Sequence, residues 1–326
     1  MTAPSDTRFF PLSTRLFPKF KGADAYALTG IAARCDWVVS SDRSEPYIED
    51  RLRTEVVDVR TVFVSLRSHE RALEHFLDVV LPQLTSPFVL VTGSEDVTLP
   101  NQTDKRWPVL SLTLRDRLLA LLDNPLLLRW FCENLDEAVH PKLEALPLGM
   151  VFPAASTDME LAVPDWGEPE ARHRRILCAH RVRDGAQWEV RKRVTALAKS
   201  HWASFVTILE DPVSEAEFEE LIRAHAFVLC VEGGGLDPSP KAWQTLLNGA
   251  VPIVRQSPVV AAYSEFPIIQ VDAWRPGALT SEKLDRWLED HFRSGRLKAR
   301  RNEVLEKLGL DHWWGRIEAC LQVSGG

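Results

Sequence analysis

The sequence predicts an α/β protein of two domains, and three observations support this class. Short apolar runs typical of buried strands alternate with helical patterns along the 326 residues. A proline-containing segment without sustained periodicity, 151–172, divides the chain near its middle. The length also fits about two domains of ordinary size. Alternating strands and helices favour parallel sheets, whose ligands bind at the carboxyl ends of the strands.

The first half contains a regular succession of expected elements. Its strands are predicted at 37–40, 62–65, 88–92 and 143–148. A helix is predicted over 69–81, and two more helices are predicted at 112–122 and 125–134, on either side of Asn124.

The second half repeats the alternation. Strands are predicted at 175–179, 205–208, 226–231, 251–254 and 268–271, and helices at 188–201, 214–223, 281–292 and 296–308. A further helical pattern follows Pro240, and Ser214 with Glu217 has the spacing of a capping box. The last segment, 311–323, carries Trp313 and Trp314.

The most informative stretch joins two of these strands through a glycine turn. Three glycines, Gly233, Gly234 and Gly235, follow the strand and its final carboxylate, Glu232. The helix after the turn carries Lys241 in its first turn. A cation is unfavourable at the positive end of a helix unless an anion is held there, so this arrangement predicts an anion site. The alternative is an ordinary strand-to-helix turn without a ligand.

Residues 232–237 and 241–254 together resemble the donor-site segment of exostosin-like glycosyltransferases. Residues 88–100 resemble a strand and acidic loop of related bacterial and algal proteins, and 124–134 and 140–149 resemble the helix and strand that close their first domain.

The resemblance implies the GT-B fold, in which two Rossmann-like domains face each other across a cleft and the C-terminal helix packs back on the N-terminal domain. It implies an acceptor-side domain at 1–155, a nucleotide-sugar-binding domain at 156–305, and a returning helix at 306–326.

Two positions depart from the pattern of that family. Lys241 stands where the family has arginine, which keeps the charge and loses the two-pronged contact to phosphate. Gln244 stands where the family has a glutamate that binds the nucleotide ribose, and a neutral amide makes a weaker contact there.

The catalytic candidates lie on the loop after the strand at 88–92. Asp96, and next to it Glu95, are carboxylates that can accept a proton from an attacking hydroxyl as a general base. Asp96 is the preferred candidate. The alternative is that both acids belong to a solvated turn or cap a helix.

A second group of donor-site candidates follows the strand at 175–179. Cations in this loop and on the next helix can stabilise the charge of a leaving diphosphate, although some of them can equally be solvated surface groups. Together with the glycine segment, the donor-binding candidates are His180, Arg181, Arg183, Arg191, Glu232, Gly233, Gly234, Gly235, Asp237, Lys241 and Gln244.

Composition and missing motifs narrow the function classes. A net charge of -7 argues against a broad nucleic-acid-binding face. No Asp-x-Asp pair occurs, so no metal site is expected. The absence of a P-loop and of a Gly-x-Ser-x-Gly elbow disfavours an ATPase and a hydrolase, and no cofactor is expected. The five cysteines share no CxxC spacing. Without a signal-like N-terminus or a membrane span, a cytoplasmic location is expected.

The prediction is therefore a glycosyltransferase that moves a sugar from a UDP- or GDP-sugar to the hydroxyl of a glycan or another acceptor. By resemblance the reaction would be inverting and independent of metal. A non-catalytic nucleotide- or sugar-binding relative is the alternative that Gln244 favours, and a GT-B epimerase is a third.

Overall fold

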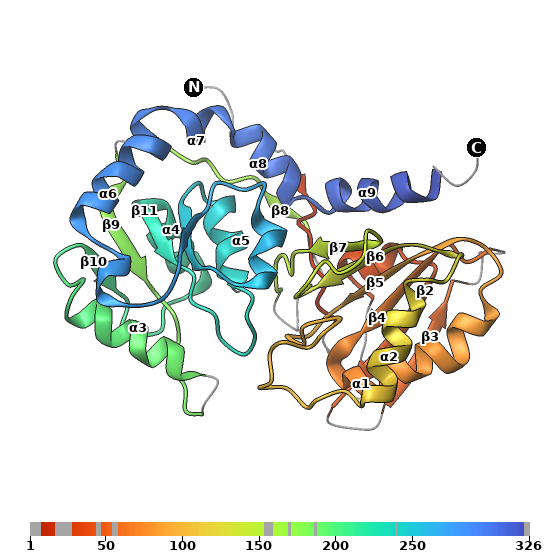
Figure 1. The fold of residues 1–326 in the computed structure, drawn as a ribbon. Coiled ribbons are helices and arrows are strands. Elements are labelled where there is room, and N and C mark those ends of the chain that lie inside the picture. Colours follow the sequence, from red (N-terminus) through yellow and green to blue (C-terminus); the bar gives the residue numbers. More distant parts are fainter. Residues whose placement is uncertain are drawn as a thin grey trace. The chain divides into compact units, whose positions relative to one another are not determined.

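A computed structural model of the chain describes residues 8–16, 28–43, 47–53, 58–152, 159–168, 171–185, 188–238 and 240–322. These residues form two compact units, coloured along the chain in Figure 1. The first unit is Phe10–Glu160 together with the C-terminal segment from Gly309. The second unit is Leu161–Leu308 together with β1 (Arg8–Phe9), which pairs antiparallel with β8 (Leu161–Ala162).

The first unit contains a six-stranded sheet of order β3-β2-β4-β5-β6-β7. Only the edge strand β3 is antiparallel to its neighbour. The strands are β2 (Trp37–Asp42), β3 (Tyr47–Leu52), β4 (Thr61–Ser65), β5 (Phe88–Gly93), β6 (Leu127–Glu133) and β7 (Leu143–Leu146). The chain goes from β2 outward to the edge strand β3 and then back past β2 to β4, after which it crosses the sheet in one direction to β7.

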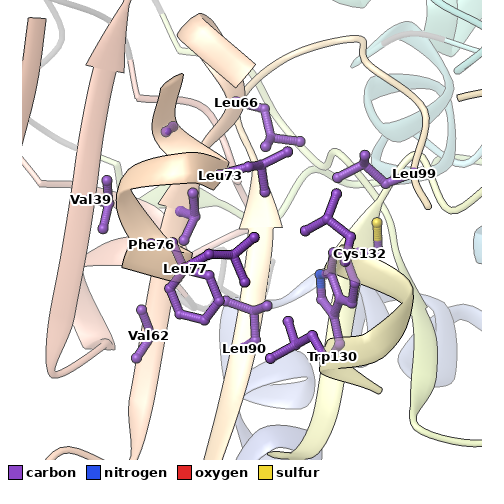
Figure 2. Packing of buried hydrophobic residues seen from close by; sticks show 14 of the residues in the cluster. Val39, Val62, Leu66, Leu73, Phe76, Leu77, Leu90, Leu99, Trp130 and Cys132 are labelled. Carbon is purple, nitrogen blue, oxygen red and sulfur yellow. The ribbon is translucent and has the colours of Figure 1, made fainter. Parts of the chain in front are cut away.

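Two helices cover one face of this sheet and complete its core. They are α1 (His69–His75), continued by a π-helical turn at Phe76–Val80, and α2 (Leu112–Leu121). Figure 2 shows Leu73, Phe76 and Leu77 packed towards Val62 and Leu90 of the strands. The inward face of the helix that was predicted at 69–81 is confirmed.

The C-terminal helix α9 (Leu310–Gln322) belongs to the first unit, as predicted. It buries Leu310, Trp313 and Ile317 and contacts β5, β6 and the 3-10 helix Gly30–Arg34. Arg316 fixes the helix by an ion pair of 2.5 Å to Glu144 of β7.

The second unit has a five-stranded parallel sheet of order β10-β9-β11-β12-β13. Its strands are β9 (His173–Cys178), β10 (Val206–Ile208), β11 (His225–Leu229), β12 (Val251–Arg255) and β13 (Ile269–Val271). The chain runs from β9 outward to β10 and then back across β9 to β11. This reversal between β9 and β11 is a topological switch point, where open α/β sheets bind ligands.

The helices of the second unit follow the predicted alternation. They are α3 (Glu189–Lys199), α4 (Glu215–Ala224), α5 (Pro240–Leu247), α6 (Ser281–Leu288) with a π-helical turn at Glu289–Arg293, α7 (Arg296–Ala299) and α8 (Arg301–Leu308). The capping box of α4, Ser214 with Glu217, is confirmed.

One predicted helix is wrong: 125–134, which the family resemblance also implied to be helical, contains the interior strand β6. Trp130 and Cys132 point into the α1 and α2 core, whereas Phe131 between them is also buried, so both faces of the segment are covered. A strand buried on both faces has a continuous apolar run that periodicity alone does not distinguish from a buried helix. The edge strand β3 was not predicted.

The segment predicted as a linker, 151–172, is partly built into the second unit. Trp166 is buried and its indole N–H donates to the carbonyl oxygen of Leu247 at 2.8 Å. Arg172 is buried as well, and its guanidinium donates to four backbone carbonyls, of Trp166, Ile222, His225 and Asn248. Two Rossmann-like units and a C-terminal helix that returns to the first are the parts of a GT-B fold, and this predicted class is confirmed.

Candidate functional site

A pocket of about 950 Å³ opens at the carboxyl ends of β9 and β10 in the second unit. Cys178 and residues 180–183 line one side, and residues from Ile208 to Glu215 line another. Phe218 of α4 and Gln244 of α5 complete the lining together with two residues of α3. The pocket therefore lies next to the switch point and has the size of a nucleotide-binding cavity.

Four of the predicted donor-binding residues line this pocket: His180, Arg181, Arg183 and Gln244. Arg181 and Arg183 are exposed, and no ion pair joins either of them to a carboxylate in the described part of the chain. The other cation of the lining, Lys199, is paired with Glu210 at 2.7 Å. The two arginines thus give the pocket positive charge on the side of the β9 loop.

Lys241 reaches the switch point from the first turn of α5. Its ammonium donates a hydrogen bond of 2.7 Å to the carbonyl oxygen of Ala179, just beyond β9. Burial, followed by the positive charge of Arg191, lowers the pKa of Lys241 to about 8. An anion bound here would relieve this repulsion, as expected for the predicted anion site.

Arg191 reaches the same place from α3. Its guanidinium donates to the carbonyl oxygens of Val231 and Glu232, at 3.2 to 3.3 Å, where β11 runs into the glycine turn. It also lies 4.8 Å from the ring centroid of Trp188. The side chain thereby connects α3 to the end of β11.

Gly233 is required by this packing. A Cβ atom built on it would lie 2.6 Å from Nη2 of Arg191 and 2.8 Å from Cζ3 of Trp188, closer than real contacts allow. The first glycine of the turn therefore makes room for protein side chains. Of the other two glycines, Gly234 is half-buried and Gly235 is buried.

His180 is a neutral ring in this site. Its Nε2 lies 2.9 Å from Oγ1 of Thr195 and 3.1 Å from the carbonyl oxygen of Arg191. Burial, followed by the charges of Lys241 and Arg191, lowers the pKa of His180 to about 3. At neutral pH the imidazole therefore adds no positive charge and instead holds the β9 loop against α3.

The two predicted acids of the glycine segment are bound to other side chains. Glu232 forms an ion pair with Arg255 at the end of β12 and accepts a hydrogen bond of 2.9 Å from the indole of Trp274. Asp237 accepts from the hydroxyl of Tyr263 at 3.1 Å. Both carboxylates are buried, and these contacts tie the glycine turn to β12, to the 3-10 helix Pro258–Tyr263 and to the segment after β13.

The predicted catalytic loop lies at the carboxyl end of β5 in the first unit. Asp96 accepts a hydrogen bond of 2.7 Å from Arg15, and its side chain is 23% exposed. Glu95 is more deeply buried and pairs with Arg43 at 2.8 Å. The guanidinium of Arg43 lies in turn 3.9 Å from the ring centroid of Trp107.

A third carboxylate, which the sequence did not single out, lies beneath this loop. Glu133 at the end of β6 is fully buried and accepts from the hydroxyl of Thr14 at 2.5 Å and from the backbone N–H of Ser94 at 2.7 Å. Burial raises the pKa of Glu133 to about 7, although Arg15, 3.6 Å away, acts in the opposite direction.

Arg15 is the centre of this acidic cluster. Burial alone would lower its pKa, but the carboxylates Glu133, Asp96 and Glu95 outweigh that effect, so the pKa of Arg15 is raised. In the sequence, this cluster is indicated only by the neighbouring hydroxyl and cation of Thr14 and Arg15, which lie far along the chain from the acids that they contact.

The described residues contain neither a metal-ligand cluster nor a helix suited to a membrane. No three or more His, Cys, Asp or Glu side chains are arranged to hold a metal ion in that part of the chain. No helix among the described residues is long and apolar enough to cross a membrane.

Comparisons with known proteins give distant likenesses only. No protein-family model matches the chain, and no curated protein matches it. Among solved structures, the spinosyn rhamnosyltransferase SpnG in complex with thymidine diphosphate is similar at 15% identity and a TM-score of 0.37, over 77% of this chain and 69% of that one. A glycotransferase of kitacinnamycin is similar at 9% identity and a TM-score of 0.36, over 82% and 76%. Likenesses this distant carry no argument about the reaction.

Proposed function

We propose that this chain is a glycosyltransferase that binds a nucleotide-diphosphate sugar in the pocket of the second unit and transfers the sugar to a hydroxyl acceptor. The observation that carries the proposal is the group of cations at the carboxyl ends of β9 and β11. Arg181 and Arg183 line the pocket, and Lys241 and Arg191 occupy the adjacent switch point. A diphosphate would supply the negative charge that this group favours.

In the proposed reaction the acceptor hydroxyl attacks the anomeric carbon of the donor sugar. The bond from that carbon to the diphosphate oxygen breaks, the nucleoside diphosphate leaves, and a carboxylate of the first unit takes the hydroxyl proton. Asp96 is the proposed base because it is the more exposed of the two acids on its loop. The cations of the second unit stabilise the charge of the leaving group. Like the exostosin-like enzymes that it resembles, the chain is proposed to invert the configuration and to work without a metal.

The first test is a thermal-shift screen with UDP, GDP and TDP, followed by donor hydrolysis and transfer assays with the sugar nucleotides that bind. At about one hundred times its dissociation constant, a ligand of the folded state adds about 2.7 kcal/mol of stability. Stabilisation by at least one nucleoside diphosphate is expected. If none of them stabilises the protein, the pocket is not a donor site.

A non-catalytic nucleotide-binding protein is the second candidate. The observation that favours it is the ion pair between Asp96 and Arg15, because a carboxylate oxygen held by a guanidinium is less available to an acceptor hydroxyl. Gln244, which lines the pocket without a charge, is consistent with this candidate. Tight nucleotide binding without donor hydrolysis or transfer would identify it.

A further inference from the structure

Trp188 lies next to two guanidinium groups of the proposed donor site. Cζ of Arg183 is 5.2 Å and Cζ of Arg191 is 4.8 Å from the centroid of its ring. Both distances are within the range of a cation–π interaction, for which tryptophan is the best aromatic partner. Trp188 is half-buried and lies immediately before α3.

The other edge of the indole packs against the glycine turn. The space that a Cβ of Gly233 would need is taken by Cζ3 of Trp188 and Nη2 of Arg191. Trp188 therefore bridges the end of β11 and Arg183, which lines the pocket. Because Arg183 is exposed and has no ion pair to a carboxylate within the described segments, the indole is what fixes its direction.

We infer that Trp188 is a positioning residue for the donor diphosphate, which acts by holding Arg183 at the pocket beside Arg191. This inference rests on the proposed function, because it assigns the diphosphate end of the same site. An ordered guanidinium loses less conformational entropy on binding than a mobile one. Because the indole orders Arg183 beside Arg191, the two guanidinium groups together favour a ligand with two linked phosphates.

The test compares inorganic pyrophosphate with the nucleosides uridine and guanosine by calorimetric titration of the full chain. Trp188→Leu should weaken pyrophosphate binding by about 2-fold to 30-fold, the range of one cation–π interaction. Nucleoside affinity should stay unchanged, because the inference assigns these arginines to the diphosphate and not to the nucleoside. Trp188→Phe should restore most of the loss, since its ring also binds cations.

Three further variants keep the test independent of folding effects. Arg183→Gln changes an exposed side chain and should weaken pyrophosphate binding by itself. In the double variant of Trp188→Leu and Arg183→Gln, the loss of pyrophosphate affinity should be smaller than the sum of the two single losses, because Trp188 acts through Arg183. Trp314→Leu, at a half-buried tryptophan of α9, is the matched control and should leave both affinities unchanged.

The outcomes separate the inference from the proposed function. If the parent binds neither pyrophosphate nor any nucleoside diphosphate, the proposed function fails and the inference fails with it. If the parent binds pyrophosphate but Trp188→Leu loses less than about 2-fold, only the inference is overturned. Equal losses of pyrophosphate and nucleoside affinity, or strictly additive losses in the double variant, also overturn it, because they indicate a general disturbance of the pocket.

Discussion

The ammonium of Lys241 donates a 2.7 Å hydrogen bond to the carbonyl oxygen of Ala179, and so joins the start of α5 to the end of β9. The contact places a buried cation at the switch point, and a second cation, Arg191, lies close to it. Such an arrangement is unfavourable in the unliganded protein and improves when an anion binds. The ionisation of Lys241 should therefore affect ligand affinity at this site, and it can be followed by varying the pH.

Lys241→Met should weaken binding of a nucleoside diphosphate and remove its pH dependence. In the parent the pKa of Lys241 is lowered to about 8, so the ammonium loses its proton as the pH rises through that value and affinity falls. The variant has no charge to lose, and its weaker affinity should stay flat between about pH 7 and pH 9 apart from the titration of the ligand.

The stability of the unliganded protein is the second readout for Lys241. Because burial disfavours the ammonium, Lys241→Met should not lower the melting temperature at neutral pH. Lys105→Met, at an exposed lysine of the first unit, is the control. An affinity that Lys241→Met leaves unaltered would exclude Lys241 from the site.

Gln244→Glu tests the ribose contact. If Gln244, which lines the pocket, faces the ribose hydroxyls, the carboxylate should retain or strengthen nucleotide binding. Gln256→Glu adds the same charge at an exposed position and should change nothing. A clear loss of nucleotide affinity in Gln244→Glu alone would place the new charge beside the phosphates and favour the non-catalytic candidate.

Asp96→Asn should reduce sugar transfer and leave nucleotide binding intact. The amide keeps the size of the side chain but does not accept the proton, and general bases typically contribute about 10²–10⁴-fold. Glu95→Gln should have the smaller effect, because Glu95 is the more buried acid and is paired with Arg43. Transfer rates are compared with those of Asp116→Asn, at an exposed position of α2. An active Asp96→Asn beside an inactive Glu95→Gln would assign the base to Glu95.

Glu133→Gln should change how stability depends on pH. Burial raises the pKa of Glu133 to about 7, above the ordinary value of 4.5, so the folded state binds this proton more tightly than the unfolded state. The stability from this group is fully present below pH 4.5 and is lost as the pH rises through about 7, by at most about 3 kcal/mol.

Urea unfolding at about pH 5 and about pH 8 measures this effect. The parent should lose more stability between the two conditions than Glu133→Gln, whose amide does not titrate. Glu74→Gln, at an exposed position of α1, should follow the parent. Parallel profiles of the parent and Glu133→Gln would show that Glu133 is ionised at both pH values.

The sequence predicts the strand and helix order of the second unit well because its strands are short apolar runs separated by clear turns. In the first unit, β6 was taken for a helix because both of its faces are buried and its apolar residues form one run. Strand β3 was not predicted because, as an edge strand, it is only partly buried and carries charged residues such as Glu49 and Arg51.

The candidate site was predictable in part. Local sequence patterns were enough to predict three residues of the pocket lining. Arg181 and Arg183 directly follow a strand, and Gln244 follows the glycine turn. Trp188 was visible only as a helix residue, since its role depends on contacts with Gly233, which follows a different strand. Thr14 and Glu133 are 119 residues apart, so no local pattern could join them.

The return of α9 makes the first unit discontinuous in the chain. Trp313 and Ile317 cover a face of the sheet that is built from residues synthesised long before them. As the ribosome releases domains from the N-terminus onward, β5 and β6 must wait, with that face uncovered, until the whole second unit has been made. The first half of the chain therefore forms an unfinished domain, whose core is completed only when α9 has been made.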